Sequence, residues 1–285
     1  MKEFRTEMQR WAPMTCWFNA TMLRRSLISA CLVSFASLYL LSCVATRSQR
    51  SPGNLLGSRR SCDVKLEDVS RFSRSQDKED ECLVQNFFEN ICGGTYVELG
   101  ALDGVKYSNS HLFHYGLDWR GVLIEPNPKN FRALRHNRPE DDTFNYAVCA
   151  SSSKVRFVGD RKRGATSGVL EFMDPSFVKE WHPNIDIAKL PTIDCKSLSD
   201  ILDESLLVPG QAIDFLSLDV EGAELEVLKT LNFTKHIFGV IFYENGGKDL
   251  EIKKLLDEHG YEFRFQALRS NFHTNRRWDD MYHML

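Results

Sequence analysis

The chain has 285 residues, of which 42% are hydrophobic and 26% are charged, and its formal net charge is -3. Such a composition is that of a globular protein, and the length allows one substantial domain with appendages. The net negative charge, with no basic stripe interleaved with aromatic residues in the second half, argues against a nucleic-acid binder. We therefore expect no nucleic-acid partner.

An apolar segment follows the N-terminal tail. Residues 26–45, SLISACLVSFASLYLLSCVA, carry no charge, and arginines flank them on both sides. Twenty helical residues span about 30 Å, the thickness of the hydrocarbon core of a bilayer. We predict a tail over residues 1–25 and a transmembrane signal anchor over residues 26–45. A cleaved signal peptide and an organelle presequence are the alternatives.

The compartment of the large domain is less directly indicated. Applied strictly, the positive-inside rule would place it in the cytosol, although basic residues of the tail partly restore the balance. The sequon Asn232-Phe233-Thr234 would be usable only in a lumen. We favour a lumenal domain on endoplasmic reticulum, Golgi or endosomal membranes, with the plasma membrane as an alternative. The cysteines form no C-x-x-C pair, so we expect no metal site, and their spacing indicates no particular disulfide pairing.

Beyond the apolar segment, residues 46–80 are rich in Ser, Arg and Asp and predict a flexible stem. From residue 81 to residue 285, strand-like and helix-like blocks alternate, with an irregular stretch at 151–189. This alternation predicts an α/β domain with a largely parallel sheet and helices on both faces, whose ligand lies beyond the carboxyl ends of the strands. Strands are expected at 95–99, 121–124, 144–148, 190–193, 213–218, 237–243 and 261–265, and helices at 108–115, after 128, at 221–231 and at 250–259.

The first clear strand runs into a glycine turn in YVELGALDGVKYSNS, where Glu98 and Asp103 lie beside Gly100 and Gly104. Glycine tolerates positive φ and lets a ligand approach the backbone closely. The spacing of these glycines is not the G-x-G-x-x-G fingerprint, and the chain has no Walker A sequence. A nicotinamide oxidoreductase is therefore disfavoured, although it is kept as a third option.

Carboxylates also follow two later strands. Glu125 stands 21 residues after Gly104, close to the spacing of about 20 at which dinucleotide folds place an acid on the ribose. Its alternative role is a helix cap. Asp219, Glu221 and Glu224 follow the strand in IDFLSLDVEGAE, where Asp219 could cap the next helix and still act in catalysis.

The segments YVELGALDGVKYSNS, GVLIEPNP, NYAVCA and IDFLSLDVEGAELEVL resemble the FkbM-type family of S-adenosylmethionine-dependent methyltransferases, over about residues 83–285. The resemblance implies a Rossmann-like class I methyltransferase sheet and S-adenosyl-L-methionine as cofactor. No acidic residue follows the third strand to bind the adenine amine. By the resemblance, Glu98, Gly100, Ala101, Asp103 and Gly104 surround the methionine part, Glu125 holds the ribose, Asn145 and Ala147 lie near the adenine, and Asp219 and Glu221 face the methyl group or the acceptor.

The same resemblance implies O-methylation, with sugar hydroxyls as acceptors. A sulfonium methyl needs in-line attack, and an unactivated hydroxyl benefits from a general base. Asp219 is the leading base and Glu244, at the end of VIFYE, the second. The expected function is a membrane-anchored O-methyltransferase acting on a glycan or another hydroxyl-bearing acceptor, with an acceptor pocket that involves FVKEWHP, Phe177 to Pro183.

A function of another class stays open. Animal proteins of the Star type resemble this arrangement of an apolar span followed by an FkbM-like domain. That resemblance implies a non-catalytic escort that moves membrane-bound cargo from endoplasmic reticulum to Golgi and through endosomes. Intact glycines and carboxylates argue only mildly against it, because a fold can keep its pocket for stability.

Overall fold

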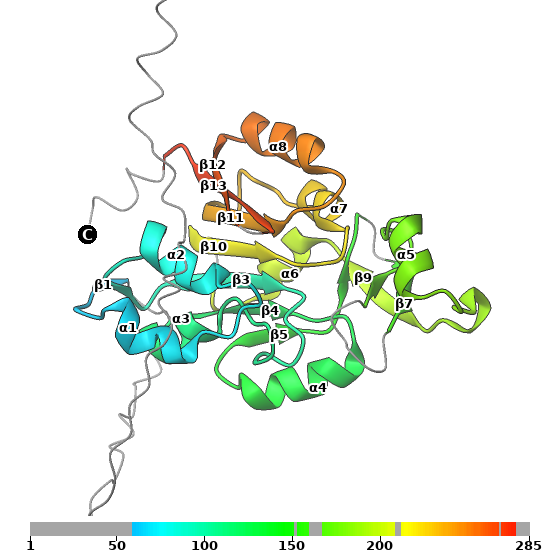
Figure 1. Ribbon diagram of the computed structural model, residues 1–285, viewed down its shortest axis with the longest axis horizontal. Helices are drawn as coiled ribbons and strands as arrows, with labels where there is room; N and C mark the ends of the chain where they lie inside the picture. The colour runs from blue at the N-terminus through cyan, green and yellow to red at the C-terminus, as the bar shows by residue number, and fades with distance from the viewer. Residues whose placement is uncertain (1–58, 151–152, 160–166, 209–211, 268, 278–285) are drawn as a thin grey trace, which may run out of the picture. The chain divides into compact units, whose positions relative to one another are not determined.

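The computed structural model describes residues 59–150, 153–159, 167–208, 212–267 and 269–277 (Figure 1). The predicted tail, the transmembrane segment at 26–45 and the first part of the predicted stem lie outside these ranges. Within them, no helix has both the length and the apolar character that crossing a bilayer requires.

The main sheet has seven strands in the order β12-β13-β11-β10-β3-β4-β5. Five adjacent strands, from β11 to β5, pair in parallel, and β13 pairs antiparallel with both β11 and β12. The chain builds outward from β3 in one direction and from β10 in the other, so a topological switch point lies between β3 and β10. The bounds are β3 (Thr95–Leu99), β4 (Arg120–Ile124), β5 (Asp142–Phe144), β10 (Ile213–Leu218), β11 (Phe238–Glu244), β12 (Tyr261–Ala267) and β13 (Ser270–Asn275).

Helices cover both faces of this sheet, which is why β3 and β10 are buried along their whole length. Successive side chains of a strand point to opposite faces. Tyr96 therefore packs with α2 (Glu79–Phe87), α3 (His111–Leu117) and α4 (Pro128–Asn137). Val97 packs with α6 (Leu198–Glu204), α7 (Glu224–Lys229) and α8 (Asp249–Glu258) on the other face. The predicted α/β architecture with helices on both faces is confirmed.

A second, smaller sheet has the order β6-β9-β7-β8, and its residues share a cavity with the carboxyl ends of the parallel strands. The prediction of an irregular stretch over 151–189 is wrong for much of this segment, because short strands and a helix form there. The predicted strand at 144–148 is divided between the two sheets. The elements are β6 (Ala147–Val148), β7 (Ser153–Val158), β8 (Gly168–Val169), α5 (Pro175–Trp181), the 3-10 helix η2 (Ile187–Lys189) and β9 (Thr192–Lys196).

The folded part begins well before residue 81. A disulfide joins Cys62 to Cys92, and the buried carboxylate of Asp80 accepts hydrogen bonds from the hydroxyls of Ser73 and Ser75. The predicted flexible stem over 46–80 is therefore wrong from residue 59 onward, because these links and a few apolar side chains order a segment of polar composition. Its elements are β1 (Arg60–Ser61), paired with β2 (Ile91–Cys92), α1 (Leu66–Val69) and the 3-10 helix η1 (Ser70–Phe72).

Candidate active site

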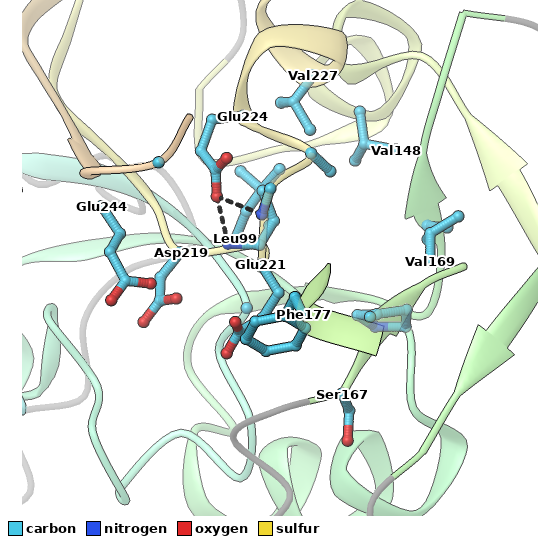
Figure 2. Close-up of a pocket in the computed structure, with 18 of the residues that line it drawn as sticks. Leu99, Val148, Ser167, Val169, Phe177, Asp219, Glu221, Glu224, Val227 and Glu244 are labelled. Carbon is cyan, nitrogen blue, oxygen red and sulfur yellow. Dashed lines mark hydrogen bonds between the residues drawn. The ribbon is translucent and has the colours of Figure 1, made fainter. Parts of the chain in front are cut away.

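A cavity of about 920 Å³ opens at the carboxyl ends of the parallel strands, where ligands bind in open α/β sheets. Its volume lies within the range usual for small-molecule sites. Figure 2 shows side chains that line it, which come from the main sheet, the small sheet and α5. Of the cofactor-binding and catalytic residues predicted from the sequence, those that line the cavity are Gly100, Glu125, Ala147, Asp219, Glu221 and Glu244.

The glycine turn after β3 brings two strand ends into contact. Gly100 has φ +80°, and a Cβ built there would lie 2.0 Å from the carbonyl oxygen of Asp219. Gly104 has φ +77°, and its Cβ would meet the side chains of Leu134 and Arg138 at 2.7 and 2.6 Å. Both glycines are thus required by packing within the protein. The backbone of Gly100 also lines the cavity.

Two other residues of this turn support its backbone. Ala101 is fully buried, and the Asp103 carboxylate accepts hydrogen bonds from the amides of Val105 and Lys106. Neither Ala101, Asp103 nor Gly104 is among the described residues that line the cavity. Of the five turn residues that the family resemblance places around the methionine part of the cofactor, Gly100 is the one among the described residues that line the cavity.

Glu98 lies behind the turn. Its side chain faces the start of α3, and its buried carboxylate accepts hydrogen bonds from the hydroxyls of Ser108 and Ser110 and from the amides of Asn109 and Ser110. Glu98 is not among the described lining residues. In this structure it holds the segment that leads from the turn into α3.

Arg138, which is not among the residues predicted from the sequence, also supports the segment that leads from the turn into α3. This fully buried guanidinium donates to Asp141, to the carbonyl oxygen of Gly104 and to the hydroxyls of Tyr96 and Ser110. Burial alone would raise the pKa of Asp141, but the Arg138 charge lowers it below its usual value. A lone arginine at the end of a helix has no sequence signature that would reveal this network.

Glu125 occupies the end of β4. It is 3% exposed, and its two carboxylate oxygens accept hydrogen bonds from the amides of Leu102, at 2.9 Å, and Asn127, at 2.8 Å. Burial raises its pKa to about 7. The Asn130 side chain also forms a hydrogen bond with this carboxylate, which offers about four acceptor sites in all. Asn145 donates to the carbonyl oxygens of Glu125 and Pro126, so it fixes this corner without itself lining the cavity.

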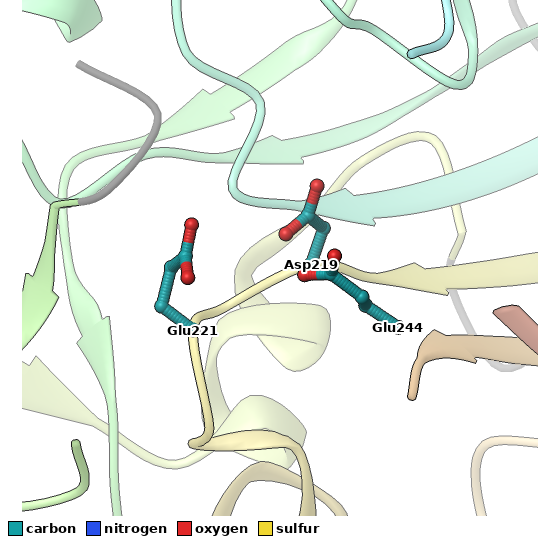
Figure 3. Close-up of side chains that lie close together, drawn as sticks. All are labelled: Asp219, Glu221 and Glu244. Carbon is teal, nitrogen blue, oxygen red and sulfur yellow. The ribbon is translucent and has the colours of Figure 1, made fainter. Parts of the chain in front are cut away.

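Three carboxylates meet on the other side of the cavity. Oxygens of Asp219, Glu221 and Glu244 all lie within 4.8 Å of one another (Figure 3), and all three residues are partly buried. Burial, followed by the charges of Glu244 and Glu221, raises the pKa of Asp219 well above its ordinary value. Burial and the charge of Glu244 likewise raise the pKa of Glu221 to about 8. The cluster can therefore retain protons at neutral pH and accept hydrogen bonds from a hydroxyl. It could also offer oxygen ligands to a divalent cation, whereas the sequence predicted no metal site.

The turn formed by the segment DVEGAE determines where the side chains of Asp219 and Glu221 lie. Glu221 has φ +55° and Gly222 has φ +93°, and a non-glycine residue in the left-handed region stores strain of about 1–3 kcal/mol. Glu224 holds the turn, because its carboxylate accepts hydrogen bonds from the amides of Val220 and Gly222 (Figure 2). The predicted helix at 221–231 consequently begins at Glu224, after the turn.

Aromatic side chains border the cavity. Phe177 and Trp181 of α5 line it, as does Tyr107 from the segment after the glycine turn. The segment FVKEWHP is predicted from the sequence to contribute to this region, but as irregular chain. Most of it forms a helix because Asp174 caps the N-terminus by accepting a hydrogen bond from Ser176, and proline occupies the first turn.

The sheet order, with the antiparallel strand β13 between β11 and the edge strand β12 and a cavity at the switch point, defines a Rossmann-like fold of the methyltransferase class. Residues 98–263 match the family described as Methyltransferase FkbM domain. This match spans more than half of the sequence, and the chain belongs to the FkbM methyltransferase family. No curated protein matches the chain significantly.

Several solved structures are similar to the chain. The ribosomal protein L11 methylase of Lactobacillus delbrueckii subsp. bulgaricus has 8% identity and a TM-score of 0.39, covering 70% of this chain and 77% of that chain. The TehB-like SAM-dependent methyltransferase of Corynebacterium glutamicum has 9% identity and a TM-score of 0.36, with 73% and 93% covered. Fibrillarin of Aeropyrum pernix, solved with S-adenosyl-L-methionine, has 14% identity and a TM-score of 0.33, with 64% and 67% covered. Similarities of this size carry no conclusion about the activity of this chain.

Proposed function

We propose that this chain is an S-adenosyl-L-methionine-dependent O-methyltransferase whose acceptor is a glycan hydroxyl. The observation that carries the proposal is that one cavity joins Glu125, at the end of β4, to the cluster of Asp219, Glu221 and Glu244, at the ends of β10 and β11. The Glu125 carboxylate can bind the cofactor, and the carboxylate cluster can accept the proton that the acceptor hydroxyl must lose.

The part of the cavity near Glu125 has hydrogen-bonding groups and apolar surface that match S-adenosyl-L-methionine. The Glu125 carboxylate lines the cavity and suits the hydroxyls of a ribose as a hydrogen-bond acceptor, and charge-assisted hydrogen bonds of this kind are worth about 1.5–3 kcal/mol each. Beside it, Ile124, Tyr146, Val148 and Phe157 give the cavity apolar surface that suits an adenine ring. Gly100 and Leu102, which also line the cavity, would contact the methionine part.

The part of the cavity near the carboxylate cluster can take a proton from the acceptor hydroxyl. When bound, the cofactor supplies a sulfonium-activated methyl group. Asp219 would accept the proton of the attacking hydroxyl, and a carboxylate with a raised pKa is a stronger base than an ordinary one. Three clustered carboxylates repel an anionic acceptor, so they favour a neutral hydroxyl compound. Phe177 and Trp181 offer apolar ring faces against which a sugar could pack.

The proposal is tested by calorimetric titration of the compact unit Leu56–Leu285 with S-adenosylhomocysteine. We expect micromolar affinity, about 8 kcal/mol. Glu125→Ala should weaken binding roughly 10- to 100-fold, because it removes the ribose hydrogen bonds. Glu251→Ala, an exposed position in the first turn of α8, is the matched control and should leave the affinity unchanged. Absence of binding by the unaltered unit would refute the proposal.

We also propose that residues 26–45 anchor the chain in a membrane of the endoplasmic reticulum, Golgi or endosomes, with the domain in the lumen. The uncharged apolar run supports the anchor. Disulfides join Cys62 to Cys92 and Cys149 to Cys195, and disulfides persist mainly in oxidising compartments, which supports the lumenal side. Resistance of the domain to protease in sealed microsomes is expected, whereas its digestion would place it in the cytosol.

A further inference from the structure

The loop between α7 and β11 carries Asn232-Phe233-Thr234, a sequence that the proposed activity does not use. We propose that Asn232 is an acceptor of N-linked glycosylation. The tripeptide has the composition that the modification requires. Both Asn232 and Thr234 are exposed in the structure, so the acceptor and the hydroxyl residue lie at the surface.

The local geometry prepares the acceptor side chain. The side-chain oxygen of Asn232 accepts hydrogen bonds from the amide of Thr234 at 3.1 Å and from its hydroxyl at 2.7 Å. The amide nitrogen is thereby the end of the side chain left for reaction. Phe233 packs against the rings of His259 and Tyr261, with centroids 4.2 and 5.9 Å apart. The middle residue of the sequon thus anchors the turn on the domain.

The position of the loop keeps a glycan away from the cavity. Asn232 precedes the amino end of β11, whereas Glu244, at the carboxyl end of this strand, lines the cavity. A seven-residue strand is about 20 Å long. A glycan at Asn232 would therefore project from the amino ends of the strands, opposite to the proposed active site. It would not block entry of an acceptor.

The disulfides connect this surface feature to a compartment. Cys62 with Cys92 and Cys149 with Cys195 each have Cα atoms 5.8 Å apart, within the usual range for a bridge. The oxidising lumen in which such bridges form is also where N-glycosylation occurs. Glycosylation of Asn232 does not depend on methyl transfer, so either proposal can fail without the other.

The reaction is a glycosyl transfer from a lipid-pyrophosphate-linked oligosaccharide. A bond forms between the side-chain nitrogen of Asn232 and the anomeric carbon of the first sugar. The bond between that carbon and the pyrophosphate oxygen breaks, and the lipid pyrophosphate leaves with the electron pair. The nitrogen loses one proton to a base of the transferring enzyme, so the charge balances.

The test uses the full chain produced in cultured animal cells and treated with an endoglycosidase that removes N-linked glycans. The unaltered chain should gain mobility on a denaturing gel by the mass of one glycan. Asn232→Gln and Thr234→Ala should migrate at the deglycosylated position with or without the enzyme. Thr234→Ser, which keeps an acceptor sequence, should retain the shift.

A second sequon, Asn19-Ala20-Thr21, precedes the predicted anchor and serves as an internal control. Asn19→Gln should leave the shift unchanged. The proposal is overturned if the unaltered chain shows no shift, or if the shift survives in Asn232→Gln and disappears in Asn19→Gln. The latter result would place the tail, and not the domain, in the lumen.

Discussion

Individual carboxylates in this cavity hold protons at pH values at which ordinary acidic side chains have lost them. Burial raises the pKa of Glu125 to about 7, and burial together with the charge of Glu244 raises that of Glu221 to about 8. A pKa near the working pH suits a group that must first hold and then exchange a proton. Burial is thus the main cause on both sides of the cavity, and the charge of Glu244 adds to it at Glu221.

Asp219 is the residue that the proposed chemistry needs most. Asp219→Asn is expected to lower the rate of methyl transfer about 10²- to 10⁴-fold, the usual contribution of a general base. Binding of S-adenosylhomocysteine should change little, because Glu125 holds the opposite side. In the unaltered protein the rate should rise with pH through about 8, where Glu221 loses its proton, and the raised pKa of Asp219 extends the rise in the same direction. Single-turnover rates across this range check it, and a flat profile would contradict the assignment.

Glu125 should also leave a signature in stability. Its folded pKa is raised to about 7 from 4.5, so the folded state binds more protons than the unfolded state between these values. The free energy of unfolding attributable to this group is therefore fully present below pH 4.5 and is lost as pH rises through 7. Glu125→Gln removes this dependence, and relative to the unaltered protein it should gain about 3 kcal/mol between pH 4 and pH 8.

Urea unfolding at the two pH values measures that difference. Glu251→Gln, at an exposed position of α8, should show no such change. Because the comparison uses the change with pH, a constant loss from the missing hydrogen bond does not affect it. An equal stability difference at both pH values would show that Glu125 titrates normally.

At the scale of elements, the site depends on the contact between the ends of β3 and β10. Gly100 and Asp219 approach so closely that any side chain at Gly100 would collide with the backbone. Around this contact, Glu98 and Arg138 hold the segment that leads into α3, and Glu224 holds the turn before α7. Glu98 and Arg138 thus act from behind the cavity wall, whereas Glu224 is itself one of the lining residues.

Gly100→Ala is expected to force the two strand ends apart. Its Cβ would lie 2.0 Å from the carbonyl oxygen of Asp219 at a φ of +80°, so the loss of stability should be at least about 1–3 kcal/mol. Affinity for S-adenosylhomocysteine should fall as well. Gly247→Ala is the control, because it lines the same cavity but its Cβ meets nothing within 4 Å. Equal tolerance of both substitutions in urea unfolding and calorimetry would contradict the proposed contact.

For the whole molecule, the sequence predicted the parallel core because β3, β4, β10 and β11 are short apolar runs between helical patterns. It did not predict β13, whose sequence SNFHTN is largely polar. That strand forms by pairing with β11 and β12, and its buried residues include Asn271 and Thr274. Such a strand is stabilised by partners distant in sequence, which a local pattern cannot reveal.

The site was predictable to a similar degree. The carboxylates at the strand ends indicated that the site lies at the carboxyl ends of the strands. They did not indicate which of these carboxylates line the cavity. Glu98 lies within β3 and shares the face of Tyr96, so it points toward α3, whereas Glu125 stands just past the end of β4 and lines the cavity. Side-chain direction alternates with every residue, and a boundary error of one residue exchanges these roles.

The most direct test of the account is a crystal structure of the unit Leu56–Leu285 with S-adenosylhomocysteine. We predict that the ribose hydroxyls bind the Glu125 carboxylate and that the sulfur lies on the side of Asp219, Glu221 and Glu244. Ligand bound outside this cavity, or a ribose held by another residue while Glu125 stays unengaged, would contradict the central claim.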